Sequence, residues 1–240
     1  MSEHLSRKEL KQDKVRETIE HGAQAVFSHT TIAAVAVLAV ALLISGYFGW
    51  KFYSERQNAQ AQDALDGALK IYNAALITSG QPALPGEPTY IDPAQRALDA
   101  QVKFSAVATK YPSATPGLFA RYYSALCLTD LDKLNQASEE LNRLTGSSNK
   151  EVAALAKYQL ALIAERNGKN DEAIKTLRAL SMGDTVLVSK PLVLLELARL
   201  LRDSDAKQAS TIYEQLKKDY PNTSVADEAD RALTTLAPKS

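Results

Sequence analysis

The sequence predicts an all-α protein in which one N-terminal transmembrane helix is followed by a solenoid of helical hairpins. Three observations predict this fold. Residues 21–50 contain no Asp, Glu, Lys or Arg. Behind them, small and large apolar residues recur at a step of 36 or 37 residues, which is the length of a two-helix repeat. Helix-forming Ala, Leu, Lys, Glu and Gln are abundant along the chain.

Residues 1–30 form a polar segment, expected in the cytoplasm, that precedes the apolar stretch. Ser6 and Glu9 fit a capping box, which predicts that a helix begins near Arg7. This helix could touch a partner at the membrane surface, or it could be a solvated leader that serves only the topology. The residues leave both interpretations open.

Residues 31–50 are expected to be the transmembrane helix. The run Ile32–Trp50, at about 1.5 Å per residue, approaches the roughly 30 Å thickness of the hydrocarbon layer. Aromatic residues gather at its end, as in an interfacial belt. The residues expected to anchor the chain in the bilayer are Ile32, Val35, Leu38, Leu42, Ile44, Tyr47 and Trp50.

Two other interpretations of this stretch fit the sequence less well. The core helix of a soluble protein would be shorter and would show a polar face, which the stretch lacks. A cleaved signal peptide would need a short leader and small residues at its exit. Here a long leader precedes the stretch, and bulky residues occupy 47–53. We therefore expect a permanent anchor.

The distribution of basic residues predicts the orientation of this anchor. Five Lys and Arg residues precede the stretch, and three lie in the twenty residues after it. Cytoplasmic flanks carry the excess of basic residues, so the N-terminus is expected in the cytoplasm. The C-terminal domain would then lie in the periplasm, on the outer side of a cell inner membrane.

Two segments separate the anchor from the repeats. Residues 51–79 are predicted to form a membrane-proximal helix, because Leu65, Leu69, Tyr72 and Leu76 follow helical spacing. Residues 80–93 contain four of the nine prolines and are predicted to form a loop, because proline cannot continue a helix. This loop is long for a helix–helix connection, which indicates an insertion.

Residues 94–240 contain the repeats. Small residues let the helices of a hairpin approach each other, and large apolar residues one turn further on fill the adjoining space. The recurring columns are Ala125, Ala161 and Ala198; Ala137, Ala173 and Ala209; Leu141, Leu177 and Tyr213; and Leu144, Leu180 and Leu216. An earlier half-copy contains Ala100, Phe104 and Val107, and residues 224–236 are expected to form a capping helix.

These columns resemble the tetratricopeptide repeat, with the alanines at its eighth and twentieth positions and Pro221 at its closing position. The sequence departs from the repeat at the fourth position, where a large apolar residue is usual. Arg121 and Lys157 stand there, and only Leu194 in the third copy restores the pattern. The resemblance implies a tetratricopeptide-like solenoid.

The order of a short tail, one span and a repeat domain resembles the YfgM-like ancillary subunits of the SecYEG translocon. That resemblance implies a scaffold that contacts translocon subunits, exported polypeptides or periplasmic chaperones. The alternative is a structural assembly factor that self-associates within an envelope complex for the outer membrane or cell wall. The sequence therefore leaves open whether the chain forms a homo-oligomer.

Several classes of function are not expected. Lys and Arg number 28, as do Asp and Glu, which argues against nucleic acid as a partner. Residues 51–240 contain no histidine, and the lone Cys127 allows no CxxC site. Ser147 and Lys150 match SxxK but are predicted to lie in a turn. We expect no enzyme activity, no catalytic residue, no metal and no cofactor.

The remaining class of function is recognition of a partner protein by the surface of the repeats. In a solenoid of helical hairpins, the first helix of each pair lines the concave face, where aromatic and Arg side chains can anchor a protein partner. The residues predicted for this face are Phe119, Tyr122, Leu126, Tyr158, Leu162, Glu165, Arg166, Leu195, Arg199 and Arg202. For each of them, packing against a neighbouring repeat is the competing interpretation.

Overall fold

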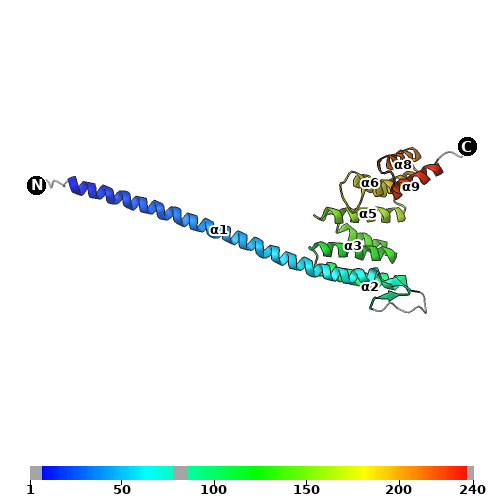
Figure 1. Cartoon of the computed structure of the whole chain (residues 1–240), viewed down its shortest axis with the longest axis horizontal. Coiled ribbons are helices and arrows are strands. Elements are labelled where there is room, and N and C mark those ends of the chain that lie inside the picture. The colour runs from blue at the N-terminus through cyan, green and yellow to red at the C-terminus, as the bar shows by residue number, and fades with distance from the viewer. Residues whose placement is uncertain (1–6, 78–85, 237–240) are drawn as a thin grey trace. The chain divides into compact units, whose positions relative to one another are not determined.

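The computed structural model describes residues 7–77 and 86–236, with side chains described for Ile32 and from Ala34 onward. Within these ranges the chain forms nine helices and two strands of two residues each (Figure 1). The predicted all-α class is confirmed. The chain divides into two compact units, residues 1–56 and residues 57–240.

The elements follow one another with short connections, except between α1 and α2. The helices are α1 (Arg7–Tyr72), α2 (Pro93–Lys110), α3 (Thr115–Asp130), α4 (Leu134–Asn142), α5 (Lys150–Arg166), α6 (Asn170–Ser181), α7 (Lys190–Leu201), α8 (Ala206–Asp219) and α9 (Ser224–Leu236). The strands β1 (Ala75–Leu76) and β2 (Thr89–Tyr90) lie between α1 and α2. Pro-rich residues 78–85 lie outside the described ranges.

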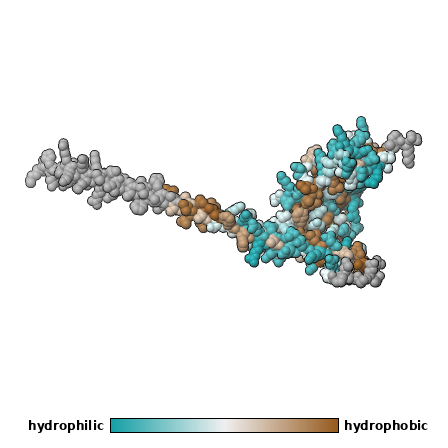
Figure 2. Space-filling view, in the orientation of Figure 1, coloured by the Kyte–Doolittle hydropathy of each residue, from teal (hydrophilic) through white to brown (hydrophobic). Residues whose placement is uncertain are grey.

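The first unit consists of the N-terminal part of α1, which begins at Arg7 as predicted. The capping residue Ser6 lies outside the described residues. All seven residues predicted to anchor the chain are exposed, by 51% to 73% of their surface, and Figure 2 shows this apolar band. A core helix would bury such side chains. Among the described residues, one helix is long and apolar enough to cross a membrane.

The end of α1 differs from the prediction. The helix stops at Tyr72 rather than at Ser79, and the chain continues in extended form as β1, which pairs in parallel with β2. Two hydrogen bonds hold this segment: the Ile77 amide donates to the Tyr90 carbonyl at 2.8 Å, and the Arg96 guanidinium donates to the Ala74 carbonyl at 3.0 Å. These non-local partners replace the last helical turns.

The second unit contains four helical hairpins and a final helix. The last part of α1 pairs with α2, and the following hairpins are α3/α4, α5/α6 and α7/α8. Figure 1 shows α2, α3 and α5 one after another in the stack. The alanines at the equivalent crossing point of the four hairpins are completely buried: Ala100, Ala137, Ala173 and Ala209. The predicted capping helix is confirmed as α9, which buries Ala229.

The first hairpin completes the half-copy that the sequence indicated. Ala61, Leu65 and Ala68 of α1 are buried in one cluster with Ala100 and Phe104 of α2. The sequence pattern hid this pairing, because residues 73–92 separate the two helices and contain the two strands. The part of α1 that follows the apolar stretch is therefore also the first helix of the solenoid.

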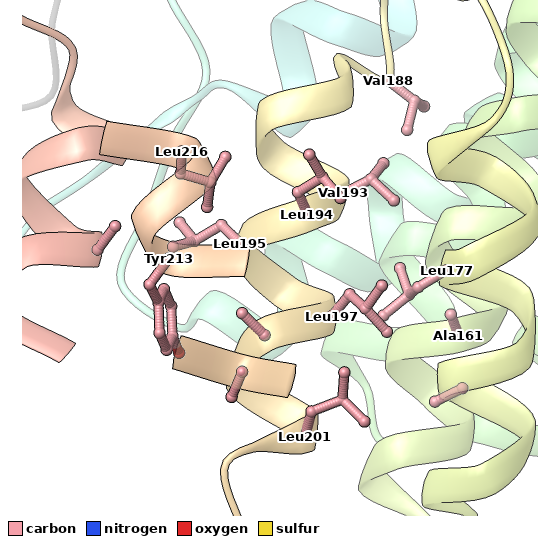
Figure 3. Packing of buried hydrophobic residues seen from close by; sticks show 14 of the residues in the cluster. Ala161, Leu177, Val188, Val193, Leu194, Leu195, Leu197, Leu201, Tyr213 and Leu216 are labelled. Atoms are coloured by element: carbon pink, nitrogen blue, oxygen red, sulfur yellow. The ribbon is translucent and has the colours of Figure 1, made fainter. Parts of the chain in front are cut away.

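The core is divided among neighbouring hairpins. Three apolar clusters follow one another along the unit, as expected where each repeat contacts only its neighbours. Figure 3 shows the largest of them, in which α7 lies between the other helices. Leu197 and Leu201 of α7 pack in one cluster with Leu177 of α6 and with Tyr213 and Leu216 of α8.

The turns inside the α3/α4 and α5/α6 hairpins share one hydrogen-bond pattern. The Lys133 amide donates to the Leu128 carbonyl, and the Lys169 amide donates to the Ala164 carbonyl, both at 2.8 Å. This closure needs a residue with positive φ, and Gly168 has φ of 73°. In the α7/α8 hairpin the spacing of the two alanines, Ala198 and Ala209, is one residue shorter. There the Asp205 amide donates to the Leu201 carbonyl at 2.7 Å.

Two glycines should respond in opposite ways to substitution by alanine. A Cβ at Gly117 would lie 1.8 Å from the Tyr111 carbonyl oxygen, whereas a Cβ at Gly67 would meet nothing within 4 Å. We expect Gly117→Ala to lower the free energy of unfolding by roughly 1–3 kcal/mol. Gly67→Ala, within a helix, should raise it by about 0.5–1 kcal/mol.

The measurement is denaturant unfolding of the full chain in detergent, followed by far-ultraviolet circular dichroism. The two variants serve as controls for each other, since both add one methyl group. Changes of the same sign would contradict the close packing of the α2–α3 turn.

Candidate functional site

The predicted binding face lies on the first helices of three successive hairpins. Tyr122 and Leu126 belong to α3, Tyr158 and Leu162 to α5, and Arg199 to α7. The two tyrosines and the two leucines are each half-buried. Leu126 and Leu162 lie outside the three core clusters. The face therefore keeps apolar surface that the core does not use.

Aromatic rings connect this face to the buried core of the first hairpin. Tyr123 stacks on Phe104 with 5.3 Å between the ring centroids. Tyr72 meets Tyr123 edge to face at 5.7 Å, and Tyr122 meets Tyr123 at the same distance. Phe104 is completely buried, and the half-buried Tyr72 and Tyr123 pack against its cluster. This contact depends on the pairing of α1 with α2, which the repeat pattern does not show.

The hydroxyls of the two central tyrosines are strongly affected by their surroundings. Burial, with smaller effects of Tyr123 and Tyr72, raises the pKa of Tyr122 to about 12. Burial also raises the pKa of Tyr158 to about 12, with contributions from the charges of neighbouring groups, Glu196 foremost. Both tyrosines are therefore neutral at physiological pH and can donate a hydrogen bond to a partner.

An ion-pair cluster borders the apolar part of the face. The Arg199 guanidinium contacts Glu165 at 2.5 Å and Glu196 at 2.8 Å. The hydrogen bond to Glu165 is the main cause that raises the pKa of Arg199. Glu165, Arg199 and Arg202 line a hollow of about 280 Å³. Glu196 was not among the predicted residues, although its place three residues before Arg199 on one helix is a signal for such a pair.

Two predicted arginines lie at the ends of their helices. Arg166 contacts the Asp132 carboxylate of the α3–α4 turn at 3.0 Å. Arg202 lies 3.8 Å from the neighbouring Asp203. Both guanidinium groups are about half exposed. Arg166 therefore links two repeats, while Arg202 faces solvent at the edge of the hollow.

Two residues predicted for the binding face pack mainly against the hydrophobic core. Leu195 is only 9% exposed and belongs to the core cluster around α7, so its place on the binding face was wrong. The hydrophobic core takes this side chain because the helix α7 is apolar on most of its circumference. Phe119 is half-buried and packs against two core clusters.

The residues considered for chemistry have structural roles. Cys127 is completely buried in the first core cluster, and burial raises its pKa to about 12. Ser147 lies in the α4–α5 turn and accepts a hydrogen bond from the Asn149 amide at 3.2 Å. Within residues 32, 34–77 and 86–236, no group of three or more His, Cys, Asp and Glu side chains could hold a metal ion.

A second hollow lies away from the predicted residues. It has a volume of about 660 Å³ and is lined by residues of α4, α5 and α6. Leu160 and Ile163 contribute to it from α5. One residue advances a helix by about 100°, so these side chains lie on the opposite side of α5 from Tyr158 and Leu162.

Comparison with known proteins agrees with this architecture. A family model described as a tetratricopeptide repeat-like domain matches residues 29–183, well over half of the chain. The chain belongs to this family. No curated protein and no solved structure matches it. Helical-hairpin repeats present extended surfaces to other proteins, so the family identifies the chain as a protein-interaction scaffold.

The limits of the match are informative. It begins at His29, so it includes the apolar stretch Ile32–Trp50 as well as the hairpins up to α6. The apolar helix and the first hairpins thus belong to one family pattern. Helices α7, α8 and α9 lie beyond the match, and their packing on α6 shows that they continue the solenoid.

The buried thiol leads to a testable prediction. The thiolate is the reactive form, and burial disfavours it. We expect iodoacetamide at pH 8 to alkylate native Cys127 at least about 100-fold more slowly than Cys127 in the denatured chain. Mass spectrometry of the alkylated protein measures both rates. Equal rates would show that the α3 core opens readily.

The same shift gives the chain a stability that depends on pH. The unfolded chain loses the Cys127 proton near pH 9.0, while the folded chain keeps it up to about pH 12. The contribution of the neutral thiol is therefore complete below pH 9 and is lost as the pH rises toward 12. Between pH 9 and pH 12 the free energy of unfolding of the Cys127→Ala variant should therefore fall less than that of the unchanged chain.

Proposed function

We propose that the chain is a membrane-tethered scaffold that binds proteins with the face formed by α3, α5 and α7. In this proposal it works on the periplasmic side of the inner membrane. Its partners are subunits of the Sec translocon, exported polypeptides or periplasmic chaperones. It acts by binding alone, without catalysis, cofactor or nucleic acid.

One observation carries this proposal: the aromatic and leucine side chains that α3 and α5 contribute to this face are only half covered. Tyr122, Leu126, Tyr158 and Leu162 keep part of their surface exposed, while Arg199 and Glu165 border them. Aromatic and Arg side chains are the common anchors of protein interfaces. Exposed apolar surface bordered by charges is typical of a polypeptide-binding site.

The family pattern supports the membrane tether, because the match includes the apolar helix. A tether raises the local concentration of a weak binding site near its target, so modest contacts on the face suffice. The excess of basic residues before the apolar stretch supports an N-terminus in the cytoplasm. The order of tail, span and repeats supports the YfgM-like interpretation.

Photo-crosslinking tests the binding face. A photoreactive amino acid in place of Leu162 should capture specific proteins in native membranes, because this side chain lies on the proposed binding face. The same group at Lys218, an exposed residue of α8, serves as the matched control. Mass spectrometry identifies the products captured at position 162 but not at 218.

Each class of product has a defined meaning. Translocon subunits, exported chains or chaperones support the proposal. A second copy of this chain as the main product would favour the assembly-factor alternative. Equal products at both positions would exclude the face as a specific site.

Protease accessibility tests the topology. In intact spheroplasts we expect added protease to digest the repeat unit and to leave the N-terminal tail protected, because only the periplasmic side is reachable. Antibodies against tags at the two ends detect the fragments. A repeat unit that becomes sensitive only after lysis would refute the periplasmic location, whatever the binding face does.

A further inference from the structure

A groove opens on the side of α5 opposite the proposed binding face. Residues of α4 and α6 form its two walls, and Leu160, Ile163 and Ala164 of α5 form its floor. A smaller hollow of about 330 Å³ continues it toward the α6–α7 loop. The two hollows share Thr145, Lys157, Ala179 and Leu180, so they form one groove.

The groove lies at the fourth position of the middle repeat, which the two neighbouring repeats close in different ways. In the α3/α4 hairpin, Arg121 occupies this position and pairs with Glu140 at 3.0 Å. In the α7/α8 hairpin, the equivalent positions hold Leu194 and Ile212, which pack into the apolar cluster.

In the middle hairpin, α5/α6, the equivalent positions hold Lys157 and Thr176. A threonine offers neither a carboxylate nor enough apolar surface to close the site. Both side chains therefore line the open groove.

The groove is basic in a chain whose total charge is balanced. Lys157, Lys169 and Lys175 line its larger part, against the single carboxylate of Glu172. Lys150 adds a fourth ammonium group in the smaller part. Among the described residues, none of these lysines forms an ion pair. An uncompensated cluster of this kind attracts a negatively charged ligand.

The α6–α7 loop adds apolar surface at one end of the groove. Gly183 and Thr185 of this loop line the smaller hollow. In the same loop Met182 is 87% exposed and Val186 is 83% exposed, which is unusual for large apolar side chains.

The loop is held in this position by Glu151. Its carboxylate accepts hydrogen bonds from the amides of Leu187, at 2.8 Å, and Val186. These bonds lower the pKa of Glu151. The carboxylate therefore stays ionised at neutral pH and keeps the apolar loop beside the lysines.

We propose that this groove is a second docking site, which binds an acidic, amphipathic segment of a partner protein. The ammonium groups of the walls pair with the carboxylates of the segment. Its apolar side chains contact the α5 floor and the exposed loop. The inference is independent of the binding face on α3, α5 and α7, because it uses the other side of α5 and different residues.

The test uses the full chain in nanodiscs of zwitterionic lipid and a fluorescent peptide of about fifteen residues. The peptide carries Leu and Glu on opposite faces of a helix, and a second peptide carries Lys in place of Glu. We expect the acidic peptide to bind, the basic one not to bind, and the affinity to fall as salt is added. Fluorescence anisotropy measures the binding.

Two kinds of variant locate the binding site. Reversal of charge at Lys157, Lys169 and Lys175 to Glu should weaken binding at least about tenfold, since three attractive contacts become repulsive. Ala179→Trp fills the groove without a change of charge and should weaken binding by a similar factor. Both changes are on exposed positions of the helices or turn, so the fold should persist.

Matched controls change the same chemistry elsewhere. Reversal to Glu at Lys103, Lys207 and Lys218 and the substitution Ala106→Trp alter exposed residues outside the groove and should leave the affinity unchanged. The groove is refuted if the controls weaken binding as much as the groove variants, or if neither peptide binds. Loss of binding in a Leu162 variant instead would assign the peptide to the other face.

A last arm separates a protein segment from a lipid. Vesicles of anionic phosphatidylglycerol are added in place of the peptide. Binding of these vesicles that depends on the three lysines, without binding of the acidic peptide, would overturn the proposal in favour of a lipid headgroup.

Discussion

The solenoid depends on one contact, the crossing of two helices over a buried alanine. Ala100, Ala137, Ala173 and Ala209 occupy this crossing in the four hairpins and have no exposed surface. A larger side chain would separate the helix axes and disturb the packing of the next hairpin. Because these crossings fix how each hairpin is built, they also fix which side chains of α3 and α5 share a face.

That arrangement gives the unit two surfaces with different chemistry. The face of Tyr122, Leu126, Tyr158 and Leu162 is apolar and aromatic, and its charges are already paired, as Arg199 is with Glu165. The groove on the other side of α5 has an apolar floor and lysines that form no ion pair within the part of the chain that the structure describes. Paired charges mainly give specificity, whereas unpaired ones attract a ligand of opposite sign. One repeat unit can therefore serve two recognition tasks.

Much of this structure follows from the sequence, for identifiable reasons. The alanine columns predicted the hairpins, because few folds other than a two-helix repeat place a small residue every 36 or 37 residues. The final helix was predicted at residues 224–236, where α9 lies, and Thr223 caps it by accepting a hydrogen bond from the Ala226 amide at 3.2 Å. The first hairpin was missed because residues 73–92 interrupt the repeat. The end of α1 was predicted too late, because helical spacing at Leu76 was outweighed by pairing with distant Thr89 and Tyr90.

The fourth position of the repeat shows how such a chain can change. Three hairpins solve the same local problem in three ways: an ion pair at Arg121, an opening at Lys157 and an apolar contact at Leu194. None of these choices involves the alanine crossings that hold the hairpins together. A repeat sequence of this kind contains several hairpins that are built in the same way. Substitutions can therefore change the surface chemistry of one hairpin while the other hairpins keep the solenoid folded. A binding site can arise in a different hairpin of the stack without a change of fold.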